Sequence, residues 1–213
     1  MSLDSHLPSP ENQPQKPQSK LAKLGAAAVL AVAGASSCGN SVTVESRDCG
    51  VDESAACPAS PPQNPFDIIR EETAKLLVSD VGMMIDLGGP QYKDVPVYNP
   101  DYQYVMTASN NDIMPGSTNA DGSLTGCWLP MDPVTREWYA KFIVDAYGFN
   151  ITTQGGQHFP DVSPDRWSYP YVETLYHWSV INGDPDGTFK PEKNVQYNEA
   201  NTEAVKAMNP VPQ

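Results

Sequence analysis

Apolar and polar residues follow a helical period in several stretches of the second half of this chain. Two stretches place residues suited to a core at i, i+3, i+4 and i+7, the spacing of one buried helix face: Tyr139, Phe142, Ile143 and Ala146, and Tyr171, Thr174, Leu175 and Trp178. Pro170 suits the first turn of the second helix. The pattern therefore predicts at least two amphipathic helices that pack on a shared core.

Further helices are indicated by similarity within the chain. Residues 66–77 follow the same plan as residues 134–143, and aligning Arg70 with Arg136 places Lys75 on Lys141. A third segment of this kind starts at Tyr197. We expect three equivalent helices that begin near Arg70, Arg136 and Tyr197.

The sequence also repeats itself at an offset of 67 residues. Residues 92–116 align without a gap with residues 159–183 and share seven of 25 residues, whereas about one or two identities would arise by chance. Each copy has an extended Asp-Val lead-in, a helix that we expect to end at Gly116 or Gly183, and a loop that leads to the next helix.

These elements predict a mainly α protein, a pseudo-threefold helical bundle with long loops, in residues 66–213. A partial repeat at 66–91 is followed by two full repeats at about 92–158 and 159–213. Aromatic residues support this boundary, because none of the 19 occurs before Phe66.

Residues 1–38 have the order of an export signal. The apolar run at residues 24–35 follows three lysines and precedes small residues, and it is shorter than the roughly 20 residues that span a bilayer as a helix. Cleavage after Ala35 would release a chain that starts at Ser36. Alternatively, residues 35–38 resemble a lipobox, so that lipidation of Cys38 would anchor the protein to a membrane. Residues 39–65, rich in Pro and Ser, are predicted to be a tether.

The four cysteines allow two interpretations. If Cys38 is lipidated, Cys49 and Cys57 can close a small loop in the tether and leave Cys127 unpaired. If Cys38 is free, all four can pair, in three connectivities that the sequence does not distinguish.

Charge and motifs narrow the function. Residues 66–213 hold 20 acidic and nine basic side chains, so a nucleic-acid partner is excluded because phosphate binding needs clustered Lys and Arg. No nucleophile elbow, phosphate-binding loop or dinucleotide fingerprint occurs, and the three histidines are scattered. We expect no enzyme activity, no cofactor and no metal.

Several motifs resemble the S-layer homology domain. They are Phe159-x-Asp161-Val162, Trp167, Val180-Ile181-x-Gly183-Asp184-Pro185-Asp186-Gly187-Thr188-Phe189-x-Pro191 and the helix start Val134-Thr135-Arg136-Glu137. The resemblance covers about residues 66–210 and is strongest at 159–191. It implies a bundle of three repeats whose grooves bind cell-wall polysaccharide, in which the helix-start Arg and nearby Gly-containing loops receive an acidic sugar.

Site candidates follow from that resemblance. Arg70 and Arg136 would hold a carboxylate beside free helix N–H groups, and Gly116 and Gly183 would let the backbone approach the sugar. The sugar-stacking candidates are Trp167 and Tyr104. The motif is altered at three positions, where Tyr197 replaces Arg, Trp138 replaces Glu and Pro100 replaces Trp.

Two functions are predicted. The first is an exported surface protein that binds an anionic cell-wall glycan noncovalently. The alternative is a structural subunit of a surface layer, filament or appendage, in which the same fold packs against other subunits as a homo-oligomer. A third interpretation, an accessory domain of a wall enzyme, is weaker because no catalytic motif is present.

Overall fold

The computed structural model describes residues 56–213, except 62–63, 90 and 120–121. Five helices form this part of the chain: α1 (Arg70–Val81), α2 (Tyr102–Asn110), α3 (Arg136–Tyr147), α4 (Tyr169–His177) and α5 (Tyr197–Met208). Extended backbone there is limited to isolated β-bridges. The predicted mainly α fold is confirmed, and the three equivalent helices begin at the predicted residues.

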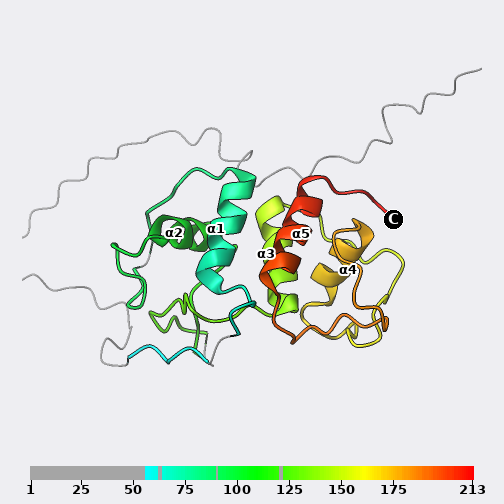
Figure 1. The fold of residues 1–213 in the computed structure, drawn as a ribbon, viewed down its shortest axis with the longest axis horizontal. Coiled ribbons are helices and arrows are strands. Elements are labelled where there is room, and N and C mark those ends of the chain that lie inside the picture. The colour runs from blue at the N-terminus through cyan, green and yellow to red at the C-terminus, as the bar shows by residue number, and fades with distance from the viewer. Residues whose placement is uncertain (1–55, 62–63, 90, 120–121) are drawn as a thin grey trace, which may run out of the picture.

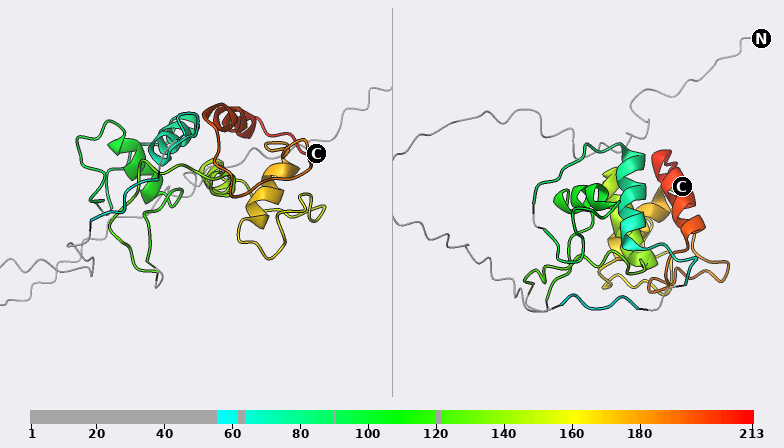
Figure 2. Two further views of the ribbon diagram at one scale, coloured as in Figure 1. Left: turned by 60° about the horizontal axis from the view of Figure 1, so that its bottom comes forward. Right: turned by 60° about the vertical axis from the view of Figure 1, so that its left-hand side comes forward.

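Three long helices, α1, α3 and α5, pack against one another and form the centre of the bundle (Figure 1). Each short helix lies on a long one, α2 on α1 and α4 on α3, and the other views show the same arrangement (Figure 2). Helix α5 turns the small residues Ala200, Ala204 and Ala207 inward. Helix α3 instead buries the predicted stripe of Tyr139, Phe142, Ile143 and Ala146.

A ring of backbone hydrogen bonds joins the segments that lead into the long helices. The amide of Ile68 donates to the carbonyl of Val195 (3.0 Å), that of Val195 to Val134 (2.9 Å), and that of Val134 back to Ile68 (3.1 Å). This closed ring fixes the pseudo-threefold arrangement and places the helix starts around one axis.

The repeated Asp-Val motif holds the loop before each following helix. Both carboxylate oxygens of Asp94 accept hydrogen bonds from the amides of Trp128 (2.9 Å) and Leu129 (2.7 Å). Asp161 accepts the equivalent bonds from Phe189 and Lys190. The aromatic rings at Trp128 and Phe189 are thereby fixed under the helix starts.

The short helices end earlier than the sequence pattern predicts. They stop at Asn110 and His177, so the prediction that Gly116 and Gly183 end them is wrong. Both glycines lie farther along, where a side chain would clash: a Cβ at Gly116 would lie 2.4 Å from the Tyr92 ring, and one at Gly183 would lie 2.4 Å from the Phe159 ring. Glycine is needed here for internal packing rather than to end a helix.

A disulfide joins Cys57 to Cys127, which are 70 residues apart in sequence. The predicted pairing of Cys49 with Cys57 is therefore wrong, because the loop that carries Cys127 folds back to the segment that enters the bundle. Cys49, the export signal and the lipidation candidate Cys38 lie outside the described residues. Within the described part, no helix has the length and apolar character needed to cross a bilayer.

Candidate functional site

Three grooves lie at equivalent places around the bundle. In each groove the first residue of one long helix shares the lining with a residue from the first turn of the next long helix. Groove A pairs Arg70 with Trp138, groove B pairs Arg136 with Glu199, and groove C pairs Tyr197 with Glu72. Their cavity volumes are about 440, 290 and 610 Å³ respectively.

In groove A the guanidinium of Arg70 carries a charge that no acid neutralises directly. Its Nε donates to the carbonyl of Trp128 (3.0 Å) and its Nη2 to that of Pro115 (2.9 Å), and its Cζ lies 4.5 Å from the centroid of the Trp128 ring. It forms no ion pair with any residue that the structure describes. Burial lowers the pKa of Arg70 to about 10, an effect opposed chiefly by Asp132. Arg70 thus stays charged at neutral pH.

Two buried oxygens of groove A have no hydrogen-bond partner within the part of the chain that the structure describes. They are Oδ1 of Asp132 and Oγ1 of Thr135, and both residues line the cavity. Buried polar atoms are normally hydrogen-bonded, so each such atom calls for an explanation. Neither atom is accessible to solvent, so a ligand in groove A would reach them only after a shift of the surrounding side chains.

Two tryptophans extend groove A along the surface. Trp138 lines the groove, and its ring centroid lies 4.6 Å from that of Trp167. Their exposed fractions are 44% and 43%. The stacking candidate Trp167 therefore lies beside groove A, in contact with Trp138, which lines the groove.

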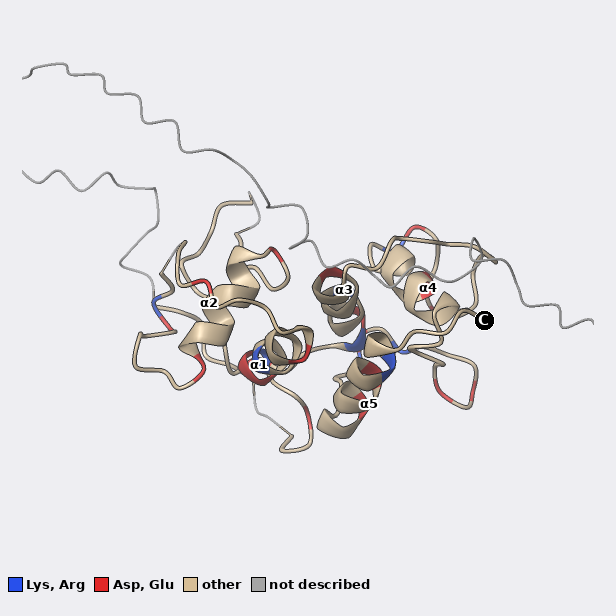
Figure 3. Cartoon of the chain, turned by 90° about the horizontal axis from the view of Figure 1, so that it is seen from above, with Lys and Arg blue, Asp and Glu red and all other residues tan. Residues whose placement is uncertain are grey.

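In groove B the guanidinium of Arg136 is paired with two acids. The side chain is only 4% exposed, its Nη1 lies 3.0 Å from Oδ1 of Asp184, and its Nε lies 3.1 Å from Oε1 of Glu199. Burial and the neighbouring Glu199 raise the pKa of Glu203, in the same lining, to about 8. Two basic residues therefore share this groove with three acidic ones, as the charges near α3 and α5 in Figure 3 indicate.

The contrast between the two grooves comes from two positions. Glu199, two residues after Tyr197, pairs with Arg136, but the equivalent residue of α3, two residues after Arg136, is Trp138. Asp184 also pairs with Arg136, but the offset of 67 places Ser117 at the matching point of groove A. Both acids that neutralise Arg136 are thus absent around Arg70.

The helix starts do not offer the free N–H groups that the sequence argument assumed. The amides of Arg70 and Arg136 donate to the carbonyls of Asp132 and Lys193, each at 2.9 Å. The amides of the residues that follow them are also bonded to loop carbonyls. Anion binding would therefore depend on the guanidinium itself.

The remaining candidates are placed differently from one another. Gly116 lines groove A and Gly183 lines groove B, where their bare backbones accommodate aromatic rings of the protein. Tyr104 is not in the lining of any of the three grooves. Its ring lies on α2 beside the ammonium of Lys75, 5.9 Å away.

One group of possible metal ligands occurs in the described part of the chain. Cys57 and Cys127 approach a carboxylate oxygen of Asp94. Both sulfurs are already joined in the disulfide, and Asp94 accepts two backbone hydrogen bonds. The arrangement is therefore structural.

Comparison with known proteins gives two similarities, each over part of the chain. The family model of the S-layer homology domain matches residues 158–200, which include α4, the loop of Gly183 and the start of α5. The predicted resemblance is thereby confirmed for this part of the chain.

An uncharacterized cell wall amidase of Bacillus anthracis is similar as well. It is 31% identical over 75 residues, which make up 35% of this chain and 14% of the amidase. The chain therefore matches only a small part of that relative. Together the two similarities place the protein at the cell surface or envelope, with a domain of a class that binds cell-wall polymers.

Some groove residues were not identified from sequence. Asp132 was not predicted to line a groove, Thr135 appeared only as part of the helix-start motif, and Trp138 only as a departure from that motif. The available signal was the departure from the motif at Trp138, because a large aromatic residue in place of a surface acid alters the neighbouring groove.

Proposed function

We propose that the protein binds an anionic cell-wall glycan noncovalently, and that groove A is the principal site. The observation that carries this proposal is the state of Arg70, which is charged, partly buried and without an acidic partner among the described residues. A carboxylate on the glycan would supply the missing counter-charge. A desolvated guanidinium pairs with carboxylates more strongly than an exposed one.

The rest of groove A suits a sugar attached to that carboxylate. Sugar hydroxyls would bind polar residues of the lining, such as Asp132. The exposed rings of Trp138 and Trp167 would stack on the next sugar along the chain, because aromatic faces bind the apolar faces of pyranose rings. Binding, and no catalysis, is the role we propose for these residues.

A wall pull-down tests the proposal. Purified cell wall is compared before and after its acidic polymer is removed, using the native protein, Arg70→Ala and Trp138→Ala. We expect the native protein to require the acidic polymer, Arg70→Ala to lose at least about tenfold in affinity, and Trp138→Ala to lose less.

The matched control is Lys75→Ala, which removes a cation from the same helix at a site outside the grooves. Its binding should equal that of the native protein. Unchanged binding by Arg70→Ala, with the wall's acidic polymer present, contradicts the assignment of groove A.

Assembly of copies is a second candidate function, favoured by the outer face of α5. Val205 and Met208 are exposed there, whereas Val78 of α1 and Val144 of α3, the equivalents of Val205, are buried. Two copies could join through this face, since a twofold axis makes one surface complementary to itself. Analytical ultracentrifugation of the native protein and Val205→Asp tests it: a monomer at all concentrations contradicts assembly.

A further inference from the structure

Groove C has the position of the other two grooves but not their chemistry. Tyr197 replaces the helix-start arginine, and the described residues that line the groove include two acids, Asp67 and Glu72, but no Lys or Arg. An anionic sugar would meet only negative charge here. With about 610 Å³, the cavity is nevertheless the largest of the three.

Two aromatic rings line groove C although the fold does not require them. Phe66 is 69% exposed and Tyr197 is 51% exposed. The residues equivalent to Phe66 before the other two long helices are Asp132 and Lys193. The residues equivalent to Tyr197 are arginines. The bundle needs only the backbone at these two positions, because the amide of Tyr197 donates a hydrogen bond to the carbonyl of Phe66 (2.9 Å). Both rings are thus available for a ligand.

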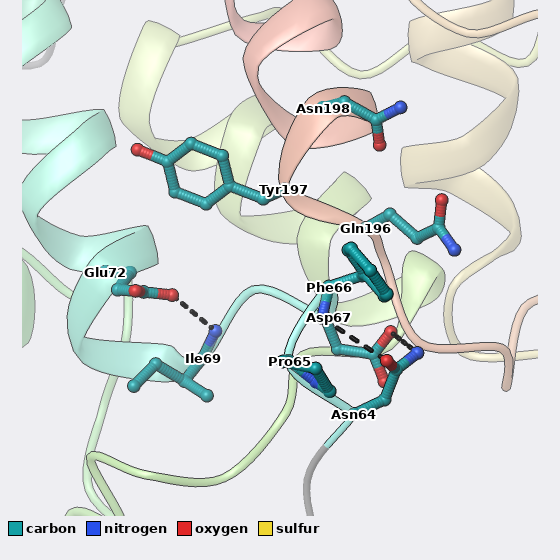
Figure 4. A pocket seen from close by; sticks show the side chains of 9 residues that line it. All are labelled: Asn64, Pro65, Phe66, Asp67, Ile69, Glu72, Gln196, Tyr197 and Asn198. Atoms are coloured by element: carbon teal, nitrogen blue, oxygen red, sulfur yellow. Dashed lines mark hydrogen bonds between the residues drawn. The ribbon is translucent and has the colours of Figure 1, made fainter.

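The polar side chains around these rings are neutral amides and the carboxylates of Asp67 and Glu72. Figure 4 shows Phe66 between Tyr197 and Glu72 on one side and Gln196 and Asn198 on the other. The Gln196 amide and the Tyr197 hydroxyl form no hydrogen bond with the described residues. Glu72 uses only Oε2, which accepts from the amide of Ile69 (3.2 Å).

This combination matches an uncharged sugar. Pyranose rings present apolar C–H faces to aromatic rings, and their hydroxyls both donate and accept, as amides and carboxylates require. We propose that groove C is a second carbohydrate site, selective for an uncharged saccharide, with Phe66 and Tyr197 as stacking faces and Gln196 and Glu72 as hydrogen-bonding groups. The site does not depend on groove A.

Saturation-transfer NMR on the full chain tests this site with two uncharged probes, a β-1,4-linked N-acetylglucosamine tetramer and a glucose tetramer. We expect at least one probe to bind the native protein, and Tyr197→Ala and Phe66→Ala each to weaken it about tenfold. Tyr197→Phe keeps the ring and should retain binding within about threefold. Circular dichroism verifies folding, which exposed positions should not disturb.

Arg70→Ala separates this site from groove A. We expect that variant to bind the uncharged probe as the native protein does, even if it no longer binds the acidic wall polymer. The assignment is overturned if neither probe binds the native protein, if Tyr197→Ala and Phe66→Ala bind normally, or if Arg70→Ala removes the signal.

Discussion

Grooves A and B are built from equivalent positions of two repeats, yet their arginines have opposite surroundings. Arg70 donates to backbone carbonyls and lies over Trp128, and no acid of the described residues is in direct contact with it. Arg136 lies over Phe189 in the same way, at 4.7 Å, but is held by Asp184 and Glu199. The same motif residue is therefore open to a ligand in one groove and a structural ion pair in the other.

The difference shows how a repeated fold can divide its tasks. The ring under each arginine and the aspartate that fixes that ring are common to both grooves. The two positions that face the guanidinium differ, with Trp138 and Ser117 in groove A against Glu199 and Asp184 in groove B. The proposed function assigns ligand binding and stability to different copies, which are distinguished by residues outside the shared framework.

The largest effect that follows from the comparison is on stability. Arg136→Ala leaves Glu199 without its ion-pair partner and Asp184 with Lys190 alone, and we expect it to lower the free energy of unfolding by about 3–5 kcal/mol. Arg70→Ala removes two hydrogen bonds and a cation–π contact and should cost about 1–3 kcal/mol. Urea unfolding of the two variants measures the difference. Equal losses contradict the division between a binding and a structural arginine.

The disulfide should have the next largest effect, and it should act on groove A. Cys127 precedes Trp128, which lies under Arg70, and groove B has Thr188 at the equivalent of Cys127. Replacing both Cys57 and Cys127 by Ser opens the loop that the disulfide closes, whose ends are 70 residues apart. It should lower the free energy of unfolding by about 2–4 kcal/mol.

Glycan affinity should fall in the same variant, because the segment that carries Trp128 in the wall of groove A is no longer held by the disulfide. Thermal unfolding and the wall pull-down measure the two effects. If the variant unfolds at a lower temperature but keeps its glycan affinity, the disulfide does not shape groove A. Reduced native protein serves as the chemical control.

Groove B should also give stability a dependence on pH. The Glu203 carboxyl has an ordinary pKa of 4.5, raised to about 8 in the folded protein by burial and by Glu199. Between these values the unfolded chain has lost the proton that the folded chain keeps, so stability falls as pH rises from about 4.5 to 8. The slope is at most about 1.4 kcal/mol per pH unit.

Glu203→Gln removes this titration while keeping the shape of the side chain. The native protein and the variant are unfolded in urea at four pH values between 5 and 8, and the difference between them isolates the contribution of Glu203. That difference should grow in favour of the variant as pH rises. A constant difference rules out the raised pKa.

Sequence reasoning reached the fold because the fold depends on local signals. The helix starts at Arg70, Arg136 and Tyr197 followed from an internal alignment, and the buried stripe of α3 followed from its period. The match of residues 158–200 to the S-layer homology domain rests on motifs that stand close together in the chain.

The site could be predicted only in outline, because its decisive contacts join distant residues. Arg70 and Arg136 look alike in sequence, and only the fold shows that Glu199, 63 residues beyond Arg136, reaches one of them. The disulfide depends on how the loop before Trp128 folds. Tyr104 shares its repeat position with Tyr171, and its role is to pack beside a lysine of α1.

Exchanging the facing residues should exchange the roles of the two arginines, with a smaller effect of about 1.4 kcal/mol, or tenfold in affinity. Ser117→Asp combined with Trp138→Glu supplies Arg70 with the acids that Arg136 has, so groove A should lose about tenfold in affinity for the acidic glycan. The wall pull-down measures this loss, and urea unfolding should show no loss of stability, because the new ion pairs offset the lost Trp138–Trp167 contact.

The converse variant, Asp184→Ser with Glu199→Ala, releases Arg136, and we expect it to restore binding when it is added to the first. A control that places two negative charges at exposed positions outside the grooves, Ser163→Asp with Gln103→Glu, separates local pairing from a general increase in negative charge. If this control weakens glycan binding as much as the groove A variant does, net charge explains the loss. If only the groove A variant weakens it, the acids facing each arginine decide which repeat binds.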